Sequence, residues 1–166
     1  MDIYVYLKLE KYLAEWYVHE NGGQPIVLKK GCAESDILEL FLQKQPQNKP
    51  VDLGREANVS IRIPSYKWKD PRVYNYLPPK AKIALAHTIY TRFRVQLWRD
   101  LHRLDNTDAP VTDLIYAWME AHGIEDDGKA WETIRQHYLR KRNSYRKMQK
   151  NESTSEACGN NTEKLL

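Results

Sequence analysis

A long amphipathic segment in the second half of the chain constrains the fold most. It begins at Pro78-Pro79, a pair suited to the first turn of a helix. Its apolar residues then recur at spacings of three and four as one continuous stripe, Ile83, Ala86, Tyr90, Phe93, Leu97, Leu101 and Leu104. This periodicity predicts a single helix over residues 78–104, which is long for a globular protein.

Two further helices are expected after this segment. The turn-rich stretch 105–110 breaks the pattern and supplies N-cap residues for a helix over 110–122, which ends at Gly123. A loop over 124–128 leads into a last helix that reaches about residue 150. Its apolar side carries Trp131, Ile134, Tyr138 and Tyr145. The second half is therefore predicted to consist of three helices, the last of them basic.

The first half shows strand periodicity. Apolar and polar residues alternate over 3–9 and again over 59–63, and a short apolar run at 26–28 follows Pro25. Helical spacing over 10–20 and an apolar run from Ser35 to Leu42 predict two helices between these strands. The fold class predicted is α+β, with a small three-stranded sheet and two helices followed by the helical half.

The domain organisation follows from length and composition. The chain has 166 residues, 42% of them hydrophobic, which suits a single globular domain over 1–150. Segment 64–78 is the one plausible hinge, so lobes over 1–63 and 78–150 stay open as an alternative. Residues 151–166 are rich in Asn, Ser, Thr and Glu, and we expect them to be disordered.

Several classes of protein are disfavoured. The sequence has no apolar run of 18 or more residues, and charges occur throughout its first twenty, so we expect a cytoplasmic protein that has no membrane partner. Its two cysteines, Cys32 and Cys158, lie far apart and predict neither a disulfide framework nor a zinc motif.

Charge is strongly segregated along the chain, although the total is only +4. Residues 62–103 hold ten basic and two acidic residues, a net charge of +8. Residues 104–132 hold one basic and eight acidic residues, net −7, and residues 133–150 hold seven basic and no acidic residues, net +7. Such blocks suit either a polyanion or a charge-matched protein partner.

The last helix carries the sharpest basic block. Gln136, Arg140, Asn143, Lys147 and Lys150 share one stripe, nearly opposite the apolar side. The hypothesis is that this helix contacts nucleic-acid phosphates through Arg135, Arg140, Lys141, Arg142, Arg146 and Lys147. The alternative is a solvated outer face whose cations complement the helix dipole.

Two other segments carry candidate nucleic-acid contacts. On the long helix, Arg92, Arg99 and Arg103 share a stripe that either extends the basic surface or pairs with the acidic block at 105–127. Before it, aromatic residues alternate with cations in a pattern that suits single-stranded nucleic acid, although it also suits a loop fixed to the core by its aromatic residues. These residues are Tyr66, Lys67, Trp68, Lys69 and Arg72.

The last two helices are helix-turn-helix-like in order, but an ordinary packed pair of helices is the favoured interpretation. Glu125, Asp126 and Asp127 precede the basic helix, and its cations crowd its far end. Backbone contact is therefore expected rather than base reading.

The sequence lacks the usual signs of catalysis. Its five histidines are scattered, and no phosphate-binding loop or nucleophile-base grouping occurs. We expect no enzymatic activity, cofactor or metal site. One alternative is a metal-dependent nuclease that uses Glu120, Glu125, Asp126 and Asp127.

Five segments resemble stretches of small uncharacterised bacterial proteins of the kind carried by integrated mobile elements. They are YLAEWYVHENGG, ESDILELFL, YNYLPP, DLIYAWMEAHGIE and WETIRQHYLRKRNSY. The resemblance covers about residues 1 to 150 and implies an accessory role related to DNA. The leading hypothesis is a non-enzymatic protein that binds the backbone of duplex DNA. The main alternative is a protein-interaction module that pairs with itself as a homodimer or with an acidic partner.

Overall fold

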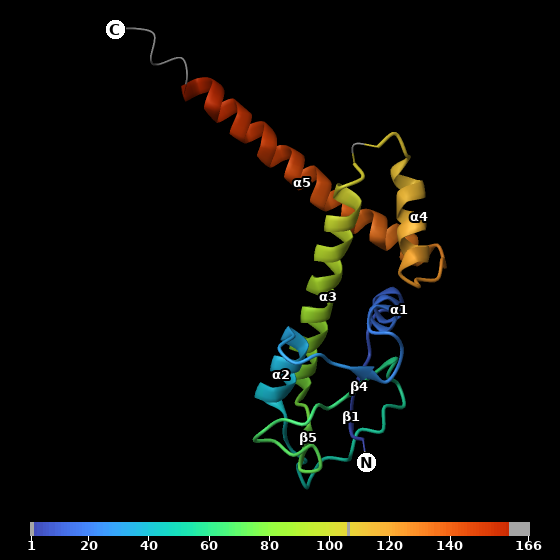
Figure 1. Ribbon diagram of the computed structural model, residues 1–166, viewed down its shortest axis with the longest axis vertical. Coiled ribbons are helices and arrows are strands. Elements are labelled where there is room, and N and C mark those ends of the chain that lie inside the picture. The colour runs from blue at the N-terminus through green and yellow to red at the C-terminus, as the bar shows by residue number, and fades with distance from the viewer. Residues whose placement is uncertain (1, 106, 160–166) are drawn as a thin grey trace.

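The computed structural model describes residues 2–105 and 107–159, with side chains described as far as residue 154. It confirms the α+β class: a small sheet and two helices in the first half precede three helices in the second (Figure 1). The helices of the first half are α1 (Lys11–Glu20) and α2 (Ala33–Phe41).

The main sheet forms where alternation predicted strands. β4 (Val59–Arg62) is its central strand, antiparallel to β1 (Tyr4–Leu7) and parallel to β2 (Ile26–Val27). Apolar side chains of β1 and β4 point into the core, and Ile61 is fully buried. A second sheet, in which β3 (Gln43–Lys44) pairs with β5 (Tyr74–Tyr76), was not predicted. Strands of two and three residues without a buried face leave no alternation to detect.

The long helix α3 (Pro79–His102) forms the axis of the fold and contacts α1, α2, α4 and α5. The predicted stripe is wrong at its ends, because Ile83 is 69% and Leu104 is 40% exposed. The helix has apolar residues in more than one direction, and periodicity alone cannot decide which direction the neighbouring elements cover. The residues that it buries recur every four positions, at Ala81, Leu85, Ile89, Phe93, Leu97 and Leu101.

Both halves of the chain contribute to one cluster of buried side chains. The Phe93 ring lies at its centre, with ring centroids of Tyr12 and Trp16 each 5.4 Å away and that of Trp118 at 5.7 Å. Helices α1 and α3 are thereby joined to α4 (Val111–Ala121).

Helix α5 (Lys129–Gly159) packs on α3 and α4 near its start and then projects away from the other elements (Figure 1). Residues 143–154 are all exposed. The structure differs here from the expected disorder, because residues 151–159 continue the helix, whereas residues 160–166 lie outside the described part. Extending an existing helix is easier than nucleating one, so polar residues can continue it without a core. In the described ranges, no helix is both long enough and apolar enough to span a bilayer.

Candidate nucleic-acid interface

Three of the six predicted contacts on α5 are exposed and have no ion-pair partner among the described side chains. Ile134 and Tyr138 are buried against the body of the protein, which turns the opposite side of the helix to solvent. Arg140, Lys141 and Lys147 lie on that solvent side. Across residues 2–105 and 107–154, no carboxylate lies within ion-pair distance of these three side chains. Their charges are available to an external anion.

The other three predicted contacts have partners inside the protein. Asp105, whose side chain is 16% exposed, lies 3.6 Å from Arg142 and 3.2 Å from Arg146. Arg135 lies 3.5 Å from Glu132, and its guanidinium also covers the Trp131 ring. The six predicted contacts on α5 therefore fall into three cations that are neutralised within the protein and three that are free in the described structure.

A groove between α3 and α5 is lined in part by one of the three free cations, Lys141. It encloses about 330 Å³, with Arg94 and Trp98 on the α3 side and His137 and Lys141 on the α5 side. Burial lowers the pKa of His137, and the charges of Arg94 and Arg140 lower it further. Positive groups from both helices thus meet at one place.

Arg94 and His137 were not singled out from the sequence. The predicted stripe of cations runs through Arg92, and Arg94 lies on another side of the same helix. One signal was available: Arg94 and Trp98 are four residues apart, a spacing that places a cation beside an aromatic residue on one helix face.

The predicted nucleic-acid contacts on α3 do not form one free basic surface, because Arg92 and Arg99 each pair with a different carboxylate. Arg92 is 2.9 Å from Glu34, and Arg99 is 3.4 Å from the adjacent Asp100. Arg103 caps the end of the helix and is exposed. The expectation that this stripe pairs with the acidic block at 105–127 is wrong for Arg92 and Arg99, since nearer carboxylates lie outside that block.

Acidic residues of this block instead hold the loop between α4 and α5 against α1 through ion pairs. Lys11 on α1 lies 2.6 Å from Glu125 and 3.7 Å from Asp127. Asp127 also accepts a hydrogen bond of 2.7 Å from the Ala130 N–H and so caps α5. The loop spans residues 122–128, longer than the turn of about three or four residues in helix-turn-helix proteins.

Three of the four acidic residues of the nuclease alternative, Glu125, Asp126 and Asp127, make contacts within this loop or with Lys11, whereas Glu120 lies on α4. In the described part of the chain, no group of three or more His, Cys, Asp or Glu side chains is arranged to hold a metal ion.

The aromatic and basic residues at 66–72 lie elsewhere. The Tyr66 hydroxyl donates to the Ser35 carbonyl at 2.8 Å, and Lys69 donates to the last carbonyls of α2, while Arg72 pairs with Asp70. Lys67, Trp68 and Arg72 are exposed, but in the described structure only Arg72 has an ion-pair partner; Trp68 is 78% exposed, and the Lys67 ammonium lies 4.9 Å from its ring centroid. This segment precedes the start of α3, and the 24 residues of α3 span about 36 Å. Helix α5 packs near the other end of α3 (Figure 1), so the residues at 66–72 lie apart from the basic residues of α5.

No match to this chain was found among protein-family models, curated proteins or solved structures.

The arrangement itself therefore carries the functional argument. Lys141 borders the groove, Arg140 stands beside it, and Lys147 continues the row about two turns further along α5. Ammonium and guanidinium groups in such a row can each contact one phosphate of an extended polyanion. We name this set the α5 basic surface: Arg94, Arg140, Lys141 and Lys147.

Proposed function

We propose that the protein is a non-enzymatic accessory protein that binds the sugar-phosphate backbone of nucleic acid, most naturally duplex DNA, through the α5 basic surface. The observation that carries the proposal is that Arg140, Lys141 and Lys147 stay exposed and unpaired in the described structure, while neighbouring cations of the same helix are neutralised.

Contact with the backbone fits this surface better than base reading. The start of α5, which reads bases in helix-turn-helix proteins, follows a loop that carries Glu125 and Asp126 on an exposed surface. The carboxylates there repel phosphates. The free cations lie further along the helix, where α5 leaves the body of the protein and a duplex meets little steric obstruction (Figure 1).

The test compares two variants of equal charge. The triple variant Arg140→Gln, Lys141→Gln, Lys147→Gln removes three cations of the surface. The control variant Lys8→Gln, Lys30→Gln, Arg55→Gln removes three exposed cations from the first half of the chain. Binding of each to a generic labelled duplex is measured by fluorescence anisotropy at low and moderate salt.

Loss of three phosphate contacts should weaken binding by about 500-fold near 0.1 M salt, whereas the control should lose less than about threefold. Equal losses in the two variants would overturn the proposal. So would an affinity that does not depend on salt. Salt-sensitive self-association without nucleic acid, measured as molecular mass in solution, would assign the surface to a protein interface instead.

A further inference from the structure

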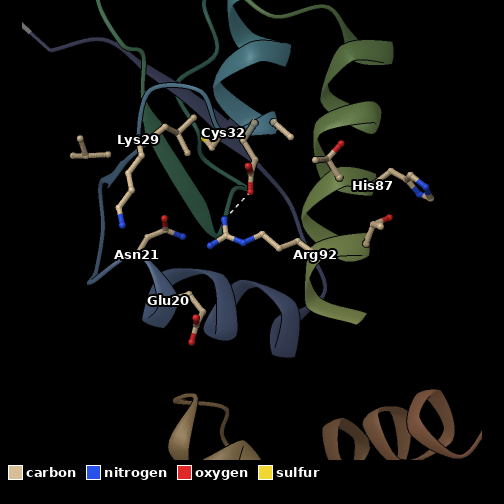
Figure 2. A pocket seen from close by; sticks show the side chains of 12 residues that line it. Glu20, Asn21, Lys29, Cys32, His87 and Arg92 are labelled. Atoms are coloured by element: carbon tan, nitrogen blue, oxygen red, sulfur yellow. Dashed lines mark hydrogen bonds and ion pairs between the residues drawn. The ribbon is translucent and has the colours of Figure 1, made fainter. Parts of the chain in front are cut away.

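A second pocket lies between α1, α2 and the middle of α3, away from the projecting part of α5 (Figures 1 and 2). It is bordered by the end of α1, the residues after β2, the start of α2 and the middle of α3, and encloses about 740 Å³. This volume is within the range of small-molecule sites. None of the four residues of the α5 basic surface borders it.

An ion pair between a buried carboxylate and a partly exposed guanidinium lies within this pocket. Glu34 is only 2% exposed, and one carboxylate oxygen lies 2.9 Å from Nη1 of Arg92. Figure 2 shows Arg92 reaching from α3 across the pocket to this carboxylate. The guanidinium also lies 5.9 Å from the Trp16 ring, so two neighbours fix its position.

The ion pair with Glu34 does not engage all the N–H donors of the Arg92 guanidinium. A guanidinium has five N–H donors, Glu34 engages Nη1, and the Arg92 side chain is 43% exposed. Such a pair contributes little net stability, because burying the carboxylate costs desolvation free energy and solvent screens the exposed guanidinium. The pair is therefore better explained by what it positions, which is a cation whose remaining donors face the pocket.

Two further features add positive potential. Lys29 extends along the side of the pocket opposite α3 (Figure 2), and no ion-pair partner is found for it among the described residues. The first turn of α2, from Ala33, forms another part of the wall, and the N–H groups at a helix start carry partial positive charge.

A buried hydroxyl on α1, the helix whose end borders the pocket, lacks a partner in the described structure. Tyr17 is 0% exposed, and its hydroxyl has no hydrogen-bond partner in the described structure. Burial raises its pKa, and the Tyr17 carbonyl accepts a hydrogen bond of 2.7 Å from Asn21, a residue that lines the pocket. Such unpaired groups are uncommon in cores and are frequent where a ligand completes the bonding.

We propose that this pocket binds a small organic oxyanion, a carboxylate or a phosphate ester, with Arg92 and Lys29 as its charged contacts and Glu34 as the residue that positions Arg92. The pocket offers binding rather than catalysis. Burial raises the pKa of the Cys32 thiol, which therefore stays protonated, and His87 points away from the pocket in Figure 2.

The test is a titration of the full ¹⁵N-labelled chain with sodium phosphate and, separately, sodium acetate, at constant ionic strength. Saturable amide shifts are expected at Lys29, Ala33 and Glu34. Lys29→Gln should weaken the saturating anion about fivefold or more, because a charge-assisted hydrogen bond is lost. Lys30→Gln, which removes the neighbouring exposed cation, is the matched control. Whichever anion saturates identifies the oxyanion.

Arg92→Lys is a second variant that keeps a cation beside Glu34 and loses the planar donor set, so it should fold and bind more weakly. The proposal is overturned if neither anion gives saturable shifts at the pocket, if Lys30→Gln weakens binding as much as Lys29→Gln, or if the shifts occur only along α5. The triple variant of the α5 basic surface should leave the pocket shifts unchanged, which separates this proposal from nucleic-acid binding.

Discussion

Asp105 restrains two cations, so removing its charge should strengthen nucleic-acid binding. Its carboxylate lies 3.6 Å from Arg142 and 3.2 Å from Arg146. The variant Asp105→Asn keeps the size of the side chain and removes the charge. Most substitutions at a binding surface weaken binding, so a gain of affinity is a demanding test of the neutralisation described above.

The expected size of the gain depends on which arginine is released. Arg146 is 53% exposed and can reach solvent, whereas the Arg142 side chain is 19% exposed and packs over the Tyr138 ring. We therefore expect one new phosphate contact. One contact adds about 0.9 to the salt slope and raises affinity about eightfold near 0.1 M salt, against about sixtyfold if both arginines were released. Losing the ion pairs should lower the free energy of unfolding by about 1 kcal/mol.

The assay is duplex anisotropy at several salt concentrations, combined with urea unfolding. Asp108→Asn is the matched control, because it removes one exposed negative charge from the same loop. The reasoning is refuted if Asp105→Asn binds the duplex no more tightly than Asp108→Asn.

Two other predictions concern titration and the backbone. Duplex binding should raise the pKa of His137 toward its ordinary value, because phosphates offset the neighbouring guanidinium charges that contribute to lowering it. The affinity for the duplex should therefore increase as the pH falls through the titration of His137. A histidine NMR titration that does not change when the duplex binds would contradict the proposed groove. Gly123→Ala should lower the free energy of unfolding, measured in urea, more than Gly128→Ala does. Both glycines have a positive φ, 68° at Gly123 and 72° at Gly128. Only at Gly123 would the new Cβ also meet the His19 ring, at 2.8 Å. The backbone term common to both is about 1–2 kcal/mol, so equal losses would show that the His19 ring moves aside freely.

The secondary structure could largely be predicted because its signals are local. Alternation located β1 and β4, and the proline pair and turn residues placed the ends of α3 close to Pro79 and His102. The buried side of α3 could not be predicted in the same way. Ile83 fits a helical stripe as well as Leu85 does, and the choice between them is made by the elements that pack on α3.

The candidate site could likewise be predicted only in part, because some of its features are local in the sequence and others depend on the folded structure. The segregation of charge is visible in the sequence and directed attention to α5. Which cations are free is decided by distant partners, since Asp105 and Arg146 are 41 residues apart and meet only after α3 and α5 pack together. Arg92 was a candidate contact for nucleic acid, and its partner Glu34 lies 58 residues away.

The salt dependence of duplex binding tests the central claim most directly. Four cations form the α5 basic surface, so a plot of log K against log salt should have a slope of about −3.6 for the natural chain. The triple variant Arg140→Gln, Lys141→Gln, Lys147→Gln should have a slope of about −0.9. Equal slopes for the two proteins would contradict the account, because the phosphate contacts would then lie elsewhere on the molecule.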